Sequence, residues 1–130
     1  MGDHIQYGLI GLASIEDYET SRIKRHEFTL PKKEADRTRL TDVQSANVGP
    51  VFLTFKDNQE AIKARMAHIV QTTQPYGDVT CEDQVGHTMW KCSVEDSEFF
   101  IEQFGQIPAL YVADGHHRTA AAYNVGKLRR

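Results

Sequence analysis

The alternation of apolar and polar positions along the chain predicts short strands separated by helices. The clearest strand is "PVFLTF" at residues 50–55, a β-branched and aromatic run bounded by turn-forming residues. The run "ALYVA" at residues 109–113 is expected to form a buried strand. Two more strands are expected nearer the N-terminus, a buried one over residues 7–14 and one over residues 21–28 that ends at His26–Glu27.

Two helices are predicted in the middle of the chain. The first covers residues 31–47 and begins at Pro31, and its few apolar residues place it at the surface or beside a polar site. The second follows Asp57, which with Glu60 three residues later resembles a capping box. Its apolar positions recur with the spacing of one helix face: Ile62, Met66, Ile69 and Val70.

Two further helices are predicted toward the C-terminus. One is expected to be capped by Asp96 or Ser97, to carry several phenylalanines and to end at Gly105. The other is the alanine-rich segment over residues 118–126, which directly follows the predicted strand "ALYVA".

A predicted hairpin over residues 79–94 interrupts the alternation of strands and helices. It is expected to bend near residues 84–86 and to return as a strand over residues 88–94. This pattern favours a mixed-sheet α/β domain, with α+β as the alternative, over a regular doubly wound fold. The length fits a single domain over residues 1–130 that is large enough to bury a core.

The charge balance, the cysteines and the lack of long apolar runs limit which partners and which cellular location are expected for the chain. A formal net charge of −3 disfavours DNA or RNA as the main partner, because phosphate contacts need an excess of Lys and Arg. Cys81 and Cys92 form no CxxC pair and are expected to be reduced thiols. No apolar run approaches the roughly 18 residues of a membrane span, and the N-terminus does not resemble a signal peptide. We therefore expect a cytoplasmic protein without a membrane partner, and its oligomeric state stays open.

The segment "LYVADGHHRTAAAY" places unusual side chains where a strand ends and a helix begins. His116, His117 and Arg118 fall in the predicted first helical turn, where the dipole disfavours a cation by about 0.3–1 kcal/mol. An anion bound at the helix start reverses that argument. Asp114 is expected to be the N-cap, and Gly115 allows a tight turn. The cluster therefore predicts an anion site, and the alternative is that these side chains are simply solvated or pair with a local carboxylate.

A second polar cluster ends the predicted strand over residues 21–28. Glu27, beside Arg25 and His26, can act as a general base or a metal ligand, and the alternative is a solvated strand end. Arg37 and Arg39 either support the same site or belong to an exposed, ion-paired helix face. No recognised ligand spacing occurs, so no dedicated metal site is predicted, whereas Mg²⁺ held by a carboxylate and substrate phosphates stays open.

Four segments carry a resemblance to a known family: "GLIGLASIEDYE", "IKRHEFT", "KKEADRTRLTDVQSANVGPVFLTF" and "LYVADGHHRTAAA". In this order they resemble a bacterial and archaeal domain-of-unknown-function family, family ten-fifteen, which is sometimes labelled ParB-like. Members of that family are longer, so the resemblance implies that this chain is an internal piece of a longer protein. The DGHHR motif also resembles that of the wider ParB/sulfiredoxin-like superfamily.

The superfamily resemblance implies a mixed-sheet fold whose strand-turn-helix binds nucleotide phosphates, and some members are free-serine kinases that use ATP or ADP. It implies that the phosphate-binding residues are Gly115, His116, His117 and Arg118, beside Asp114. It also suggests, more weakly, that Glu27 is the counterpart of the catalytic carboxylate of the kinases. Sulfinic-acid repair would need a cysteine inside the motif, where this chain has Gly115–His116.

The leading hypothesis is a nucleotide-binding, kinase-like phosphotransferase that acts on a small metabolite such as a free amino acid, with ATP or ADP and Mg²⁺. His117 and Arg118 would stabilise the transferring phosphoryl group, Asp114 would orient the site or hold Mg²⁺, and Glu27 would deprotonate the acceptor hydroxyl. A non-catalytic nucleotide- or anion-sensing module is the main alternative, and a metal-dependent hydrolase is a third. Whether the protein is an enzyme stays open at this point.

Overall fold

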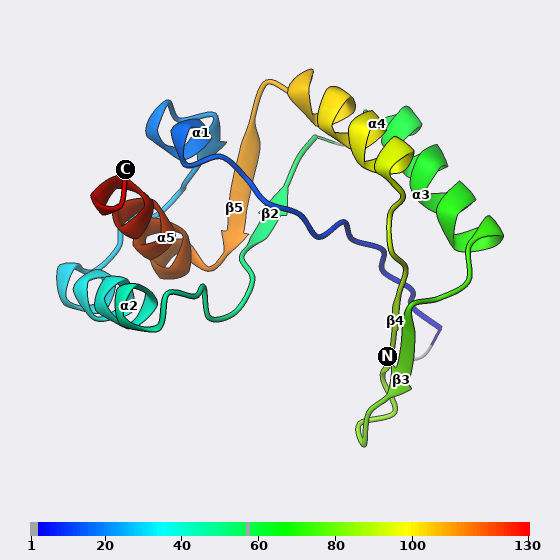
Figure 1. Cartoon of the computed structure of the whole chain (residues 1–130), viewed down its shortest axis with the longest axis horizontal. Helices are drawn as coiled ribbons and strands as arrows, with labels where there is room; N and C mark the ends of the chain where they lie inside the picture. The colour runs from blue at the N-terminus through cyan, green and yellow to red at the C-terminus, as the bar shows by residue number, and fades with distance from the viewer. Residues whose placement is uncertain (1–2, 57) are drawn as a thin grey trace. The chain divides into compact units, whose positions relative to one another are not determined.

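The computed structural model describes residues 3–56 and 58–130. Helices and strands follow one another along the chain in this order: α1 (Ile15–Glu19), β1 (Ile23–Lys24), α2 (Pro31–Gln44), β2 (Phe52–Thr54), α3 (Glu60–Thr72), β3 (Gly77–Thr80), β4 (Gly86–Met89), α4 (Val94–Gly105), β5 (Leu110–Asp114) and α5 (His116–Leu128) (Figure 1). Parallel and antiparallel strands share a sheet, which confirms the α/β or α+β class with a mixed sheet. None of the described helices is long and apolar enough to cross a bilayer.

Contacts within the chain divide it into two compact units. The sheet unit consists of Gly11–Lys56 and Ile107–Arg130, and the hairpin unit contains the described residues 3–10 and 58–106. Two compact units can belong to one domain, so the single domain over residues 1–130 stays a prediction.

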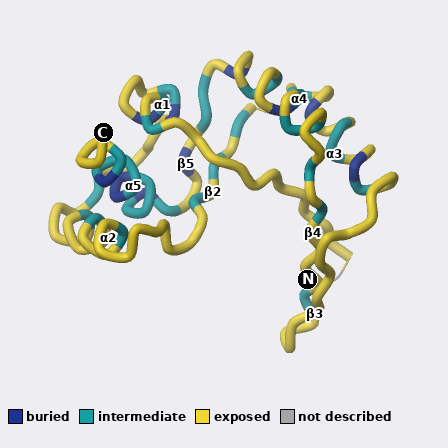
Figure 2. The backbone as a smooth tube through the Cα atoms, viewed as in Figure 1, coloured by how far each residue is buried: buried dark blue, intermediate teal, exposed yellow. Residues whose placement is uncertain are grey.

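The sheet unit is built around the buried strand β5. This strand pairs in parallel with β1 and antiparallel with β2, so it is the central strand of the sheet. Val112 is only 1% exposed and joins Tyr18, Ile23 and Ala120 in the core. Figure 2 shows buried positions on β5 and α5. The predicted strand "ALYVA" is therefore confirmed as a strand, although its buried side chain is mainly that of Val112.

Helix α5 packs against its neighbours through small side chains. Ala120 and Ala121 are buried on α5, and α2 lies alongside it. Gly126 lets α1 approach closely, since a Cβ atom there would lie 2.9 Å from the Ile15 Cδ1 atom. Bulky residues at these positions would push the helices apart. Small residues thus fix where α5 lies, and with it the position of its first turn.

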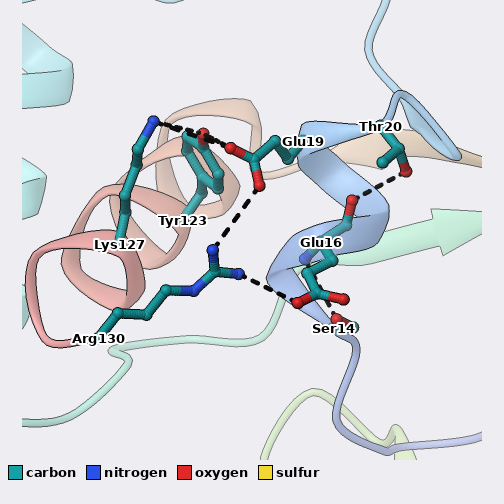
Figure 3. Close-up of polar contacts among 7 residues, drawn as sticks. All are labelled: Ser14, Glu16, Glu19, Thr20, Tyr123, Lys127 and Arg130. Carbon is teal, nitrogen blue, oxygen red and sulfur yellow. Dashed lines mark hydrogen bonds and ion pairs between the residues drawn. The ribbon is translucent and has the colours of Figure 1, made fainter.

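Polar contacts between α1 and α5 reinforce this packing (Figure 3). The Tyr123 hydroxyl donates to Glu19 at 3.2 Å, and Lys127 and Arg130 form ion pairs with the same carboxylate at 3.8 and 3.9 Å. Arg130 also lies 3.6 Å from Glu16. Exposed ion pairs of this kind contribute little individually, about 0–1 kcal/mol each, so their main effect here is orientation.

The hairpin unit contains α3, α4 and the β3–β4 ribbon. Ile62 and Ile69 of α3 are buried, which confirms the predicted apolar stripe, and Phe100 of α4 is buried too. Every residue of β3 and β4 is exposed. The ribbon turns at Gln84, which has a positive φ of 65°.

Several predicted boundaries are wrong. Residues 7–14 form no strand and are exposed, because no described strand pairs with them. Only Ile23–Lys24 of the predicted strand over residues 21–28 pairs with β5. The return strand of the hairpin ends at Met89, because the chain turns to enter α4 at Val94. These runs satisfy the local pattern of a strand but lack a neighbouring strand to complete it.

The predicted helix caps also need correction. Ser93, rather than Asp96 or Ser97, is the N-cap of α4, and its hydroxyl accepts a hydrogen bond from the Asp96 backbone N–H at 3.0 Å. The predicted capping box at Asp57 lies outside the described residues, and Gln59 is the N-cap of α3. The helix that begins at Pro31 is confirmed, and it buries none of its residues, as its polar composition predicts.

Candidate functional site

The site begins where the central strand β5 passes into α5. Gly115 is the N-cap residue and has a φ of 90°. This is a left-handed conformation that residues with a Cβ atom rarely adopt. His116, His117 and Arg118 form the first turn, as predicted. The prediction that Asp114 is the N-cap is wrong, because Asp114 still belongs to β5 and no described side chain caps α5. The N–H groups of the first turn therefore have no side-chain cap among the described residues, and the turn contains no acidic residue to balance the positive end of the helix dipole.

Arg118 lies across this turn in a fixed position. Its Nη2 atom is 3.0 Å from the Asp114 Oδ2 atom, an ion pair between positions four apart. A Cβ atom built on Gly115 would meet the same Nη2 at 2.9 Å, and one built on Gly49 would meet Nη1 at 3.0 Å. The guanidinium is thus packed against two glycines with positive φ, and larger residues at either position would displace it.

His116 is the buried polar residue of the junction. Its side chain is 6% exposed, and its Nδ1 atom is 3.2 Å from the Glu27 Oε1 atom, on the segment that follows β1. The His26 ring contacts it edge to face, with 4.5 Å between the ring centroids. Its other nitrogen, Nε2, has no hydrogen-bond partner among the described residues. The structure thereby brings Glu27, His26 and His116 together, although the sequence separates the two segments by most of the chain.

His117 is oriented differently from His116. Its Nε2 atom accepts a hydrogen bond from the Leu30 backbone N–H at 3.1 Å, directly before α2. A neutral ring that accepts at Nε2 carries its proton on Nδ1. His117 therefore stabilises the start of α2, where no side chain of α2 provides a cap.

Beside these residues lies a polar cavity of about 150 Å³. It is lined by Tyr18, Glu19, Arg25, Glu34, Ala120, Tyr123 and Asn124. Arg25 donates to the Tyr18 hydroxyl at 2.7 Å, and its guanidinium carbon lies 4.9 Å from the centre of that ring. The predicted supporting residue Arg25 is thus held at the site by an aromatic residue from α1.

Glu34 belongs to this cavity and was not among the residues predicted from the sequence. It accepts hydrogen bonds from the Thr29 hydroxyl and from the Asn124 amide, the latter at 2.8 Å. The Thr29 hydrogen bond lowers the pKa of Glu34 most, followed by that of Asn124, and the charge of Arg25 lowers it further against the opposing effect of burial. Glu34 therefore favours its ionised form and ties α2 to α5.

A sequence signal for Glu34 does exist. The helix over residues 31–47 has too few apolar residues to bury a face, which indicates that its polar residues border a site. Glu34 and Thr38 stand four positions apart on one face of it, and Asn124 lies within hydrogen-bonding distance of both. Arg37 and Arg39 are exposed on α2 and take part in none of these contacts.

The arrangement offers two kinds of chemistry. The start of α5 presents N–H groups and Arg118 to an anion, and the Glu27–His116 pair presents a buried nitrogen without a partner among the described residues. Among the described residues, no three His, Cys, Asp or Glu side chains are grouped as a metal site.

Comparison with known proteins gives a family and no activity. The sequence model of the family described as "Protein of unknown function (DUF1015)" matches residues 1–130. Neither the search of curated proteins nor the search of solved structures gave a match.

Proposed function

The chain belongs to the DUF1015 family, and from its site we propose that it binds the phosphate of a nucleotide or a related anion and transfers a phosphoryl group to a small polar metabolite, such as a free amino acid. The start of α5 carries this proposal. It combines a left-handed glycine, an absent side-chain cap among the described residues and a first turn without acidic residues. Such a helix start favours an anion, because its N–H groups and dipole attract negative charge.

The neighbouring side chains support phosphoryl transfer in particular. Transfer depends on positioning and on neutralising the charge of the phosphoryl oxygens, which Arg118 and the first-turn N–H groups can provide. The Glu27–His116 pair supplies a proton acceptor for the metabolite's hydroxyl group. ATP or ADP with Mg²⁺ would supply the phosphoryl group, and the exposed carboxylate of Asp114 would hold the ion.

The position of this site in the chain also agrees with the resemblance to ParB/sulfiredoxin-like proteins. In that superfamily a strand-turn-helix binds nucleotide phosphates, and β5, Gly115 and α5 follow one another here as a strand, a turn and a helix. We propose the correspondence on the DGHHR motif and on this geometry.

A non-catalytic anion or nucleotide sensor is the second candidate, and the Asp114–Arg118 ion pair favours it. The two side chains lie 3.0 Å apart, and an anion that takes over Arg118 would release Asp114. Binding can thereby be reported without turnover.

The experiment combines ligand binding with product detection. We expect phosphate, ADP or ATP with Mg²⁺ to raise the melting temperature, and Arg118→Ala to abolish that rise. Arg39→Ala, on the exposed face of α2, is the matched control and should keep it. Incubation with ATP or ADP, Mg²⁺ and a panel of amino acids should then give a phosphorylated product by mass spectrometry.

The outcomes separate the candidates. A ligand-dependent rise without product would support the sensor. If no phosphate-containing ligand changes the melting temperature, or if Arg118→Ala responds as the control does, the anion site is refuted.

A further inference from the structure

We propose that Nε2 of His116 is the atom that takes the proton from the acceptor hydroxyl, and that Glu27 is a positioning residue acting through His116. This inference rests on the proposed phosphoryl transfer and assigns its proton acceptor to one atom. It differs from the expectation that Glu27 accepts the proton directly.

The close approach of the two residues favours one nitrogen of the ring as the proton carrier. Glu27 Oε1 lies 3.2 Å from Nδ1 of His116, and an ionised carboxylate only accepts hydrogen bonds. A carboxylate at this distance favours the neutral ring with its single proton on Nδ1, so that Nε2 keeps a lone pair. The carboxylate thus selects the tautomer in which Nε2 is a base.

The surroundings of Nε2 make this lone pair unusual. The side chain of His116 is 6% exposed, and Nε2 has no hydrogen-bond partner among the described residues. A buried polar atom left in this way costs about 1–3 kcal/mol, so it needs an explanation beyond folding. A bound substrate hydroxyl that donates to Nε2 provides one.

The other residues of the cluster are less suited to the role. The Nε2 atom of His117 already accepts from the Leu30 backbone N–H at 3.1 Å, so its lone pair is occupied. The side chain of Glu27 is 59% exposed, and one of its oxygens is engaged by His116. The His26 ring meets His116 edge to face at 4.5 Å and limits rotation of the His116 ring.

The position of the pair suits the reaction. His116 is the first residue of α5 and stands next to Gly115, so its ring lies beside the N–H groups proposed to bind the phosphoryl group. Arg25, Glu27, His116 and Thr119 line one crevice, which brings a cation near the pair.

The proton-transfer step balances within this pair and its substrates. The hydroxyl proton moves to the Nε2 lone pair, and the ring becomes an imidazolium whose charge the Glu27 carboxylate stabilises. The hydroxyl oxygen forms a new O–P bond to the transferred phosphoryl group. The P–O bond to the rest of the nucleoside di- or triphosphate breaks, and its electron pair leaves on the nucleotide's oxygen.

The first test is spectroscopic and needs no activity. In the whole chain labelled with ¹⁵N-histidine, long-range ¹H–¹⁵N spectra at a pH where the ring is neutral should show the His116 proton on Nδ1. Glu27→Ala should shift the ring toward the Nε2–H form, whereas Glu27→Gln should keep the Nδ1–H form because its amide oxygen still accepts. A proton found on Nε2 in the wild type would overturn the inference.

The second test uses turnover. His116→Ala should lower kcat by roughly 100-fold or more with little change in KM, and added imidazole should restore part of it. Glu27→Ala should lower kcat by roughly 10-fold through the lost tautomer. His87→Ala on the exposed strand β4 is the matched control and should leave kcat unchanged.

The two tests fail in distinguishable ways. If no acceptor is phosphorylated, the proposed function fails while the tautomer result stands on its own. If transfer occurs but folded His116→Ala or His116→Gln keeps kcat within about twofold, the assignment of the base is wrong. If Zn²⁺ alone binds at micromolar concentration and shifts the Nε2 resonance, Nε2 is a metal ligand and the inference is also overturned.

Discussion

Helices α4 and α5 are almost equal in length but begin in opposite ways. The α4 helix starts after Ser93, whose hydroxyl caps the Asp96 N–H at 3.0 Å, and two acidic residues occupy its first turn. The α5 helix starts after Gly115 with no side-chain cap among the described residues and no acidic residue in its first turn. One helix start is therefore satisfied by its own side chains, and the other is not.

The difference between the two helix starts distinguishes a start that its own side chains stabilise from one that could bind a ligand. Caps and first-turn acids stabilise a helix by about 0.3–2 kcal/mol, and the chain uses both at α4. At α5 it places histidines and an arginine instead, and it leaves Nε2 of His116 without a partner among the described residues. Local stability given up at one helix start, and kept at another, is what the proposed anion binding at α5 would explain.

The largest effect is expected for Gly115→Ala. Its φ of 90° strains any L side chain, and the new Cβ atom would meet Arg118 Nη2 at 2.9 Å and Val51 Cγ1 at 3.1 Å. We expect the free energy of unfolding to fall by about 1–3 kcal/mol in chemical denaturation. The rise in melting temperature with phosphate should disappear as Arg118 moves.

The matched control is Gly105→Ala at the end of α4, where a Cβ atom would meet nothing within 4 Å. It should leave the free energy of unfolding unchanged or raise it by up to about 1 kcal/mol. Equal losses for the two variants would show that Gly115 has no special role.

An intermediate effect is expected at the capped helix. Ser93→Ala removes the hydroxyl that accepts from the Asp96 N–H, and it should lower the free energy of unfolding by about 1 kcal/mol. The response to phosphate should stay as in the wild type. Ser97→Ala inside α4 is the control and should be close to neutral. A Ser93→Ala variant with full stability would contradict the contrast between the two helix starts.

The smallest effect concerns the carboxylate of Glu34. Its pKa is lowered in the folded protein by the hydrogen bonds from Thr29 and Asn124. A lowered pKa means that the ionised group stabilises the fold above its ordinary pKa, and that this stability is lost as the pH falls through the folded value. Between about pH 6 and pH 3, the wild type should therefore lose more stability than Glu34→Gln, by less than about 1 kcal/mol. The control is Glu102→Gln at an exposed position of α4, and it should lose as much stability as the wild type over the same pH range. If Glu34→Gln also loses as much stability as the wild type, the Glu34 carboxylate does not contribute to stability.

The helices and the central strand could be predicted from the sequence because their patterns are local. Pro31 marks the start of α2, the spacing of Ile62 and Ile69 gives α3, and "ALYVA" gives most of β5. The failures depend on partners elsewhere in the chain. Residues 7–14 have the composition of a strand but pair with none of the described strands, and β1 is short because only two of its residues pair with β5.

The candidate site divides in the same way. The first turn of α5, with His116, His117 and Arg118, follows from a strand, a glycine and an alanine-rich helix in succession. The Glu27–His116 contact cannot be read from spacing, because it depends on how the segment after β1 folds beside α5. Glu34 escaped prediction for a similar reason, since its partner Asn124 lies 90 positions away.

The hydrogen bond between Leu30 and His117 also joins positions far apart, 87 residues along the chain. The sheet has the same property, because β5 pairs with β1 and β2 only after the whole hairpin unit has been made. Closing the long loops between such distant partners costs chain entropy before the contacts can stabilise the fold, so folding slows as their share rises. A nascent chain that ends before Leu110 therefore lacks both the central strand and the helix start at which we propose that an anion binds.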